Sequence, residues 1–460
     1  MTYQNYSRDQ LQKIDAAHYL HPFSNHKELR AAGARMIVRG DGPYVYDTEG
    51  AEILDGMAGL WCVNIGYGRH ELAEAAAAQL KELPFYNSFF ACATPTPVLL
   101  SGKLAELAPA GINQVFYGSS GSEANDTALR IVRHYWALEG KPEKNIIISR
   151  TTAYHGSSIA ATSLGGMAKM HKQLGGAVPN IVHVMPPYAF ELAEPGESDH
   201  DFGIRAARAV EVAILEAGPD KVAAFIGEPV MGAGGVRIPP ASYWPEVQAI
   251  CRKYDVLLML DEVITGYGRT GEWFAAKTFG IEPDTITTAK ALTSGYQPLS
   301  ALLIGDRIAA TLVEKGGEFT HGYTYSGHPV ACAVALKNLE IMEREGLVER
   351  VRTDTGPYFN RALRERLDDH PLVGEVRSIG LMAAIEIVSD KGSRSRHQPA
   401  GTAGLIVRDH AIAGGLMLRA IGDTLVMSPP LIWTRETIDL ACERLRQALD
   451  RGADELARRR

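Results

Sequence analysis

Two ionisable residues in the middle of the chain, Lys290 and Asp261, each follow an apolar or β-branched run. Lys290 ends the run 284–290, and Asp261 follows the apolar run 256–260. Such runs are typical of buried parallel strands, and open α/β sheets place their chemistry at the carboxyl ends of those strands. A lysine in that position loses its hydration, which disfavours the ammonium form, and the neutral amine can form a Schiff base.

Asp261 and Arg419 are charged side chains among apolar neighbours, and each needs a polar partner. A carboxylate at position 261 is costly to bury unless a cation or a donor meets it. A protonated pyridine nitrogen is one such partner, and the capping of a helix is the ordinary alternative. Arg419 lies in the apolar stretch 416–430, where its guanidinium requires a carboxylate. A substrate, Glu228 or another internal acid could supply it, and the sequence leaves the three open.

Two segments rich in small or hydroxyl-bearing residues are candidate phosphate sites. Residues 118–125 follow a short predicted strand and open a helix, where unpaired amides and the Ser122 hydroxyl could hold a phosphate. Ser122 and the residues 123–125 behind it could instead only cap the helix. The polar loop 321–329 precedes another helix, and Thr324 in this loop could donate to a phosphate.

Two aromatic residues could face a flat cofactor or its substrate. Tyr154 follows the predicted strand 145–149, where its ring could stack on a planar ligand or fill the core. His155 beside it is either a partner of a site residue or an ordinary buried polar group. Trp61 lies in the glycine-rich segment 55–68, where it either walls a pocket or packs in the core.

Composition places the chain among ordinary globular proteins. Of its 460 residues, 46% are hydrophobic and 22% charged, and the net charge of −7 comes without a basic block, so nucleic acid is not an expected partner. The five cysteines are scattered and form no Cys-x-x-Cys pair, so we expect neither a disulfide framework nor a metal site. The sequence also shows no signal peptide and no apolar stretch long enough to span a bilayer. The expected location is therefore the cytoplasm.

Residues 71–325 alternate between predicted helices and strands, which indicates an α/β fold with a mainly parallel sheet and helices on both faces. The predicted helices of this part are 71–83, 123–136, 204–215 and 243–254, and the predicted strands are 115–117, 145–149, 222–226 and 256–260. After about residue 330 the pattern changes to α+β. There the predictions are helices at 330–345, 355–367 and 434–451 and a strand pair within 376–388. A short strand at 44–46 and surface loops at 191–203 and 390–404 complete the prediction.

Taken together, several segments resemble the class III, pyridoxal-phosphate-dependent ω-aminotransferases, and within them the amine or ω-amino acid–pyruvate aminotransferases. The segments are 55–68, 120–126, 154–156, 261–271, 289–290, 321–329 and 419–430. The resemblance covers nearly the whole chain and implies fold type I. Residues 71–330 would form the large cofactor-binding domain with a seven-stranded sheet, and residues 1–70 and 331–460 a small α+β domain. It also implies a homodimer with active sites at the interface, and whether dimers pair into a tetramer stays open.

The resemblance assigns a role to each candidate site residue. Lys290 would be the Schiff-base lysine, and Asp261 would pair with the ring nitrogen of pyridoxal 5'-phosphate. The remaining cofactor contacts would be Gly121 and Ser122 on the phosphate, Thr324 of the neighbouring subunit on the same phosphate, and Tyr154 and Val263 on the two ring faces. Arg419 would bind a substrate carboxylate and swing away for amines that lack one. Trp61 would line the substrate pocket, and Phe23 and Tyr323 would add to its aromatic walls.

The implied reaction moves an amino group from a primary amine or ω-amino acid to pyruvate. Lys290, once freed, would shuttle the proton as general base and acid. Diamines, β-alanine, taurine and arylalkylamines all stay open as donors, and so does the preference for pyruvate over 2-oxoglutarate. The alternatives are a decarboxylase, racemase or aminomutase of the same fold, and a non-catalytic binding protein. Ala291, residues 299–301 with Ser300 among them, and Met231 depart from the family pattern near the expected cofactor site.

Overall fold

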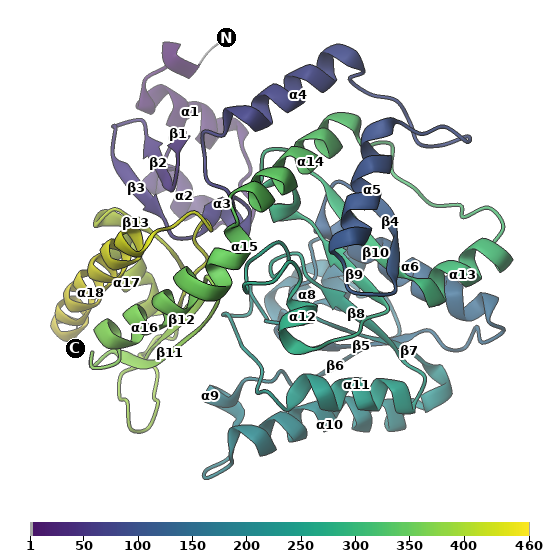
Figure 1. The fold of residues 1–460 in the computed structure, drawn as a ribbon. Helices are drawn as coiled ribbons and strands as arrows, with labels where there is room; N and C mark the ends of the chain where they lie inside the picture. The colour runs from purple at the N-terminus through teal and green to yellow at the C-terminus, as the bar shows by residue number, and fades with distance from the viewer. Residues whose placement is uncertain (1–2, 460) are drawn as a thin grey trace.

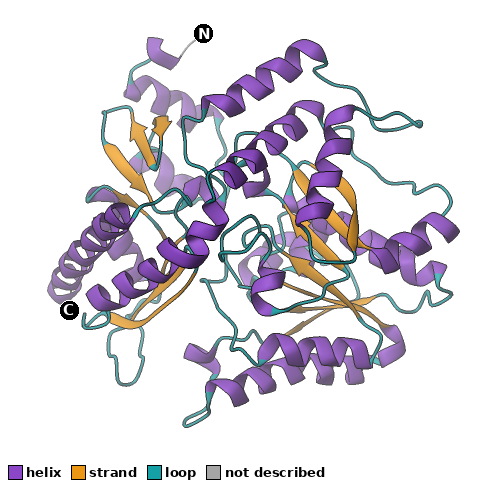
Figure 2. Cartoon of the chain, in the orientation of Figure 1, coloured by secondary structure: helices purple, strands orange, loops and turns teal. Residues whose placement is uncertain are grey.

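The computed structural model describes residues 3–459, which fold around a central seven-stranded sheet with helices on both of its faces (Figure 1). Two four-stranded sheets lie to one side of it, near the two ends of the chain (Figure 2). The α/β class and the seven-stranded sheet expected from the sequence are confirmed. Among the described residues, none of the helices has the length and apolar character needed to cross a lipid bilayer.

The central sheet has the strand order β4-β10-β9-β8-β7-β5-β6. Its strands are β4 (Ile112–Gly118), β5 (Ile146–Arg150), β6 (Ile181–Val184), β7 (Val222–Gly227), β8 (Leu257–Asp261), β9 (Thr285–Thr288) and β10 (Ser300–Gly305). β10 runs antiparallel to both β4 and β9, and the other neighbours pair in parallel. β6 and β10 are absent from the sequence prediction, because β6 is short and β10 starts with small residues that have little β propensity.

Alternate residues of the central strands pack against helices on opposite faces of the sheet. Leu257 and Met259 of β8 join the cluster built on α6 (Gly121–Leu138). Leu258 and Leu260 join the cluster that contains the buried apolar side chains of α10 (Asp199–Ala217) and α11 (Tyr243–Lys253). A strand that is covered on both faces has a continuous apolar run in its sequence, and this pattern predicted β8.

The predicted helices of the large sheet region are confirmed, with ends that differ by a few residues. They correspond to α4 (His70–Glu82), α6, α10 (Asp199–Ala217) and α11 (Tyr243–Lys253). The other helices before residue 350 are α1 (Arg8–His18), α2 (His26–Ala32), α3 (Ala58–Trp61), α5 (Pro95–Leu107), α7 (Ile159–Leu164), α8 (Ala168–Leu174), α9 (Ala189–Leu192), α12 (Ala275–Phe279), α13 (Asp306–Lys315), α14 (Pro329–Arg344) and α15 (Leu347–Arg350).

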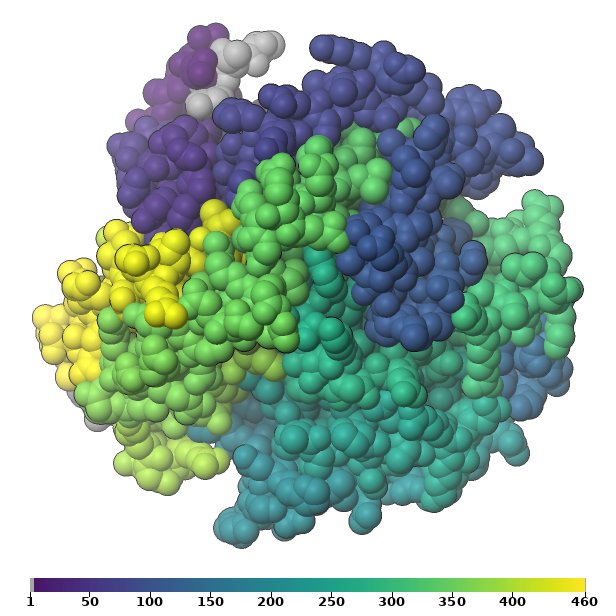
Figure 3. Space-filling model, viewed as in Figure 1, coloured from purple at the N-terminus to yellow at the C-terminus, as the bar shows by residue number. Residues whose placement is uncertain are grey.

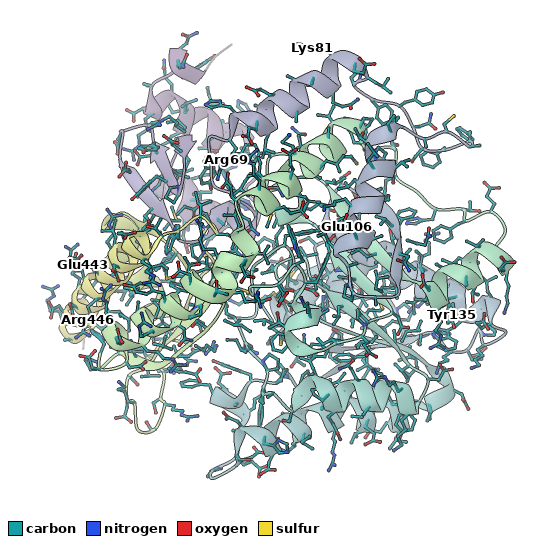
Figure 4. All side chains as sticks on the ribbon, viewed as in Figure 1. Arg69, Lys81, Glu106, Tyr135, Glu443 and Arg446 are labelled. Carbon is teal, nitrogen blue, oxygen red and sulfur yellow. The ribbon has the colours of Figure 1, made fainter. Side chains whose placement is uncertain are left out.

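Helices α4, α5 and α14 pack together above the sheet (Figure 1). Arg69, directly before α4, donates from both terminal nitrogens to the Glu345 carboxylate at 2.8 Å, directly after α14 (Figure 4). This two-pronged pair fixes the start of one helix to the end of the other.

The predicted loop 191–203 is wrong at its end, because α10 begins within it. Ser198 precedes the helix, and its hydroxyl oxygen accepts a hydrogen bond from the Asp201 amide at 3.1 Å. Ser198 is therefore an N-cap, and the acidic residues that suggested a loop lie in the first turn of a helix, where negative charge is favourable.

The predicted loop 390–404 is also too long, because α17 (Thr402–Ala413) begins at residue 402. The Asp423 carboxylate accepts hydrogen bonds from the amides of Gly401 and Gly404 at 2.8 and 2.9 Å. The helix start is thus capped by a residue from a distant part of the chain, which no local pattern could indicate.

The two ends of the chain meet in the smaller sheets. One sheet contains β1 (Ile37–Asp41), β2 (Tyr44–Asp47), β3 (Glu52–Asp55) and β13 (Leu416–Met417), and the other β11 (Val373–Ile379), β12 (Met382–Ile387), β15 (Thr424–Met427) and β14 (Arg419–Ile421). β13 runs parallel to β3, and the surface view shows the first and last segments of the chain adjoining (Figure 3). The predicted strand pair and C-terminal helices are confirmed as β11, β12, α14, α16 (Gly356–Leu367) and α18 (Arg435–Arg458). The three-part division at residues 70 and 330 stays a prediction.

Candidate active site

Lys290 lies just beyond the carboxyl end of β9, as the sequence predicts. The short 3-10 helix η3 (Lys290–Thr293) starts at the lysine, whose backbone is left-handed with φ +45°. Burial lowers the pKa of the Lys290 amine, and the nearby Cys62, Asp261 and Glu228 act in the opposite direction. Since only the uncharged amine attacks a carbonyl carbon, this environment favours Schiff-base formation.

The Asp261 carboxylate ends β8 and is held by three hydrogen bonds. Its Oδ2 accepts from Asn125 Nδ2 and from His155 Nδ1, each at 2.8 Å, and its Oδ1 accepts from the Val263 amide at 3.1 Å. The residue is 5% exposed, so these donors replace the water that a buried carboxylate loses. Turns follow Asp261 rather than a helix, so the interpretation of this aspartate as a helix cap is wrong.

Neighbouring strands deliver the acid and the lysine to the same edge of the sheet. Asp261 pairs in register with Thr287 of β9, which precedes Lys290. The negative charge of Asp261 is near enough to raise the pKa of Lys290 against the effect of burial. The structure therefore brings together the two residues that sequence analysis placed at the centre of the chemistry.

The start of α6 approaches this edge closely. A Cβ atom on Gly121 would stand 2.9 Å from a Val263 methyl group, so only glycine lets the helix start lie against Val263. The N-cap is Ser120, whose hydroxyl accepts from the Glu123 amide at 3.3 Å, so the interpretation of Ser122 as the cap is wrong. The first amides of a helix have no intrahelical acceptor, so the start of α6 is suited to bind an anion.

The Ser122 hydroxyl faces the loop that follows β5. Its oxygen accepts a hydrogen bond from the Ser157 amide at 3.0 Å. Gly156 has φ +137°, and a Cβ there would stand 2.5 Å from Ser122 Oγ. Glycine is thus required at position 156 for both reasons, and the loop carrying Tyr154 is pressed against the helix start.

Tyr154 is half-buried rather than a core tyrosine. Its hydroxyl shares a hydrogen bond of 3.0 Å with Ser157 Oγ, and the ring of Phe23 meets its ring edge-on, with centroids 6.4 Å apart. Phe23 itself is 71% exposed. The two rings predicted as parts of one site therefore lie next to each other at the surface of this chain.

Glu228 follows β7 and is a buried acid of the same edge. Its Oε1 accepts from the Tyr154 amide at 3.2 Å and its Oε2 from the Gly232 amide at 2.9 Å. Burial raises the pKa of Glu228, and the neighbouring His155 and Arg150 oppose that shift. Glu228 is therefore held by backbone amides, and no arginine of the described residues forms an ion pair with it.

Arg419 is half-buried in β14, and burial lowers the pKa of its guanidinium. Within residues 3–459 no carboxylate lies within ion-pairing distance of it, so the internal partners considered for Arg419 are wrong. Its charge is near enough to Lys290 to lower the pKa of that amine. Arg419 is thus a cation at the site whose partner the described chain does not supply.

Of three further predicted residues, Trp61 packs beside the carboxyl ends of β7 and β8, and Tyr323 and Thr324 lie in the loop before α14. Trp61 is 1% exposed and belongs to an apolar cluster with Val230 and Ile264, so its role as a pocket wall stays a prediction. The Tyr323 hydroxyl donates to the Glu123 carbonyl oxygen at 3.1 Å, and Thr324 beside it is exposed. The contact of Thr324 with the phosphate of a neighbouring subunit, which the resemblance implies, stays a prediction.

Sequence analysis missed Asn125 as a site residue and considered it only as part of a helix cap. Its partner Asp261 is 136 residues away in the chain, so no local pattern connects them. The signal available was its place three residues after Ser122, which puts both side chains on one face of the helix start.

Comparison with known proteins identifies the family. The family model of class-III aminotransferases matches residues 26–449. The putrescine–pyruvate aminotransferase of Pseudomonas aeruginosa is 49% identical over 96% of both chains, and a diaminobutyrate–2-oxoglutarate transaminase of Halomonas elongata is 44% identical over 93% of this chain and 92% of its own.

Solved structures agree with this assignment. The ω-transaminase of Pseudomonas jessenii in complex with PMP has a TM-score of 0.95 at 41% identity, covering 97% of this chain and 99% of its own. A thermostable (S)-enantioselective ω-transaminase of Thermomicrobium roseum has a TM-score of 0.94 at 44% identity, with the same coverage. The fold-type-I architecture expected from the sequence is confirmed. The chain belongs to the class-III aminotransferase family and is a pyridoxal-phosphate-dependent transaminase.

Proposed function

We propose that this protein transfers an amino group from a primary amine or ω-amino acid to pyruvate, with pyridoxal 5'-phosphate bound at Lys290. The observation that carries the proposal is the lysine amine with a lowered pKa at the same sheet edge as the triply hydrogen-bonded Asp261. The 49% identity to a putrescine–pyruvate aminotransferase supports an amine donor and pyruvate as the substrates, and it favours ω-diamines among the donors to be tested.

The residues present fit the cofactor. The close approach of Gly121 to Val263 leaves the first amides of α6 and the Ser122 hydroxyl for its phosphate, and Tyr154 and Val263 for the two faces of its ring. Asp261 would pair with the ring nitrogen and keep it protonated. When bound, the cofactor supplies an electrophilic carbon and an electron-withdrawing ring.

The protein's own groups then hold charge and move protons. Lys290 Nζ carries a proton between the substrate carbon and the cofactor carbon, because the lowered pKa of the amine favours its uncharged form, which can accept a proton and then return it. Arg419 binds the carboxylate of pyruvate with its paired N–H groups, which no internal acid occupies among the described residues. Trp61, Phe23 and Tyr323 are the proposed aromatic walls around the donor.

We further propose that the active enzyme is a cytoplasmic homodimer in which Thr324 of one chain reaches the cofactor phosphate of the other. Exposed apolar side chains before and within α5 support an interface there. They are Tyr86, Phe89, Phe90, Val98 and Leu99, with Phe90 92% exposed. Light scattering of the purified protein distinguishes the expected dimer from a tetramer. The small domain would then comprise residues 1–70 and 331–460, which the pairing of β3 with β13 supports.

A donor panel tests the function. Purified protein with cofactor is given putrescine, β-alanine, taurine or an arylalkylamine, together with pyruvate or 2-oxoglutarate, and the amino acid formed is quantified. We expect alanine formation that requires both pyruvate and a donor, with a diamine among the best donors. Loss of CO₂, racemisation or amino migration without pyruvate would instead identify a decarboxylase, racemase or aminomutase. Preference for 2-oxoglutarate would contradict the proposed acceptor.

A further inference from the structure

We propose that Asn125 is a positioning residue that acts through Asp261 to keep the proton on the ring nitrogen of the bound cofactor. The inference rests on the proposed function, because it assumes that Asp261 faces that nitrogen. It assigns a role to a residue of α6, the helix whose start is the proposed phosphate site. Through Asp261, this helix would also act on the ring nitrogen at the other end of the cofactor.

The contacts of Asn125 are short and completely enclosed. The residue is 0% exposed, and its Nδ2 donates to Asp261 Oδ2 at 2.8 Å and to the His155 carbonyl oxygen at 2.7 Å. His155 Nδ1 donates to the same Asp261 Oδ2 at 2.8 Å. Both donors thus converge on one carboxylate oxygen, and Asn125 also fixes the backbone of the histidine that provides the second.

The orientation of the amide follows from its neighbours. Asp261 Oδ2 and the His155 carbonyl oxygen are both acceptors, so the Asn125 group between them must present its NH₂. The opposite orientation would place the Asn125 oxygen against two other oxygens in a buried site. Asn125 is therefore a dedicated donor to the carboxylate.

The other half of the amide argues against a purely structural role. Asn125 Oδ1 is buried and has no hydrogen-bond partner among the described residues. A buried unsatisfied carbonyl is costly, and a leucine of similar shape would avoid that cost. The buried carbonyl of Asn125 is thus destabilising, and the two hydrogen bonds of Nδ2 are what this side chain contributes in return.

The hydrogen bonds on Asp261 indicate how the Asn125 donor would act on the carboxylate. Oδ2 accepts from two side chains, whereas Oδ1 accepts only from the Val263 amide, which leaves Oδ1 capacity for one more donor. Donors to a carboxylate stabilise its ionised form. An ionised Asp261 leaves the shared proton on the ring nitrogen, and loss of the Asn125 bond would let that proton move to the aspartate oxygen.

The helix adds a geometric link. Asn125 lies one turn after Gly121 and Ser122, so the same rigid element presents the phosphate-binding amides and the donor to the acid. A displacement of the helix start would therefore disturb both ends of the cofactor together.

The test compares Asn125→Leu and Asn125→Ala with the wild type, and uses Gln248→Leu as a matched control. Gln248 is also a buried amide with two hydrogen bonds, to the Gly280 carbonyl oxygen and from the Glu282 amide, but it lies on α11 away from Lys290. The readouts are the ¹⁵N NMR shift of the ring nitrogen in ¹⁵N-labelled cofactor, kcat/KM, and the melting temperature.

We expect Asn125→Leu to shift the ¹⁵N signal towards unprotonated pyridine and to lower kcat/KM about 10- to 100-fold. Asn125→Ala should show a smaller change in both, because water can enter the vacated volume and donate to Asp261. Its melting temperature should nevertheless be the lower of the two, since it leaves a cavity. A structural role alone would make alanine the worse variant in every readout, and the control should keep the wild-type ¹⁵N signal.

The failures are distinguishable. If the wild type binds no cofactor at Lys290 after borohydride reduction, the proposed function is overturned. If it does, and Asn125→Leu keeps the wild-type ¹⁵N signal, the role of Asn125 is overturned while the proposed function stands. Should Asn125→Leu not fold, the ¹⁵N signal and kcat/KM of Asn125→Ala decide alone, and wild-type values for both would contradict the inference.

Discussion

The acid end and the arginine end of the site differ in how firmly the protein holds them. Asp261 is 5% exposed and accepts hydrogen bonds from α6, from the loop after β5 and from its own loop. Arg419 is half-buried on the three-residue strand β14, without a carboxylate partner among the described residues. A charge fixed on all sides suits a group that stays bound, whereas an unpaired guanidinium suits ligands that come and go.

The difference matches what a two-substrate transaminase needs. The cofactor stays through both half-reactions, so the carboxylate proposed to hold its ring can be preorganised at a cost met once in folding. The amine donor and pyruvate enter the same space in turn and differ in charge. A cation without an internal partner can bind the carboxylate of one and leave the other unhindered.

The largest effect is expected from Lys290→Ala, which removes the amine that both Asp261 and Arg419 influence. Turnover should fall about 10⁴-fold or more, because the variant has neither the Schiff-base amine nor the proton carrier. The protein should also lose its visible cofactor absorption. Spectra and alanine formation measure both, and a coloured, active variant would contradict the assignment.

Asp261→Asn should come next and should affect both half-reactions alike. The substitution keeps the shape but removes the charge, which leaves the donors Asn125 and His155 facing a neutral amide. Loss of one partner of a buried ion pair predicts a decrease of about 10²- to 10³-fold. Single-turnover rates with donor and with pyruvate are the measurement, and a loss confined to one substrate would argue against a fixed acid.

Arg419→Leu should instead separate the two substrates. The KM for pyruvate should rise about 10- to 100-fold, because a two-pronged charge-assisted contact is lost. The half-reaction of a donor without a carboxylate should stay within about threefold of the wild type. Arg419→Lys keeps the charge but loses the two-pronged contact, so its KM for pyruvate should lie between those of the wild type and Arg419→Leu. Equal losses for both substrates would mean that Arg419 supports the site's structure instead.

The smallest effect concerns the apoprotein and pH. Burial lowers the folded-state pKa of Lys290 below its unfolded value, so the folded state releases a proton that the unfolded state keeps. The free energy of unfolding contributed by Lys290 therefore increases as pH rises from the folded pKa towards the unfolded one, and is lost as pH falls through the folded pKa. Apoprotein carrying Lys290→Met should be at least as stable as wild type at neutral pH, and the gap should narrow at alkaline pH. Urea unfolding across pH measures it, and a gap that widens with pH would contradict the assigned pKa direction.

Much of the fold could be predicted because its strands carry strong local patterns. The apolar runs of β7 and β8 reflect burial on both faces, and α6 and α11 each carry buried residues on one side of the helix. β6 is only four residues long, and the small residues that begin β10 carry no such pattern. The start of α17 depends on Asp423, which contacts it only after the chain has folded.

The candidate site divides in the same way. Lys290 and Asp261 could be recognised because strand ends place charged residues at a known edge of the sheet. Its donor Asn125 could not, since 136 residues separate the two in the chain. The sequence indicates His155 as a partner of a site residue, but it does not indicate which one, because Asp261 lies 106 residues away. The amides that hold Glu228 are equally invisible, because every residue has one and only the folded loop aims them.

The most direct test of the account is to map the cofactor onto the chain. Protein reconstituted with pyridoxal 5'-phosphate is reduced with borohydride, digested and analysed by mass spectrometry. The account predicts one modified site, on the peptide that contains Lys290, and its disappearance when a donor amine is added before reduction. Modification of a different lysine, or none at all, would contradict it.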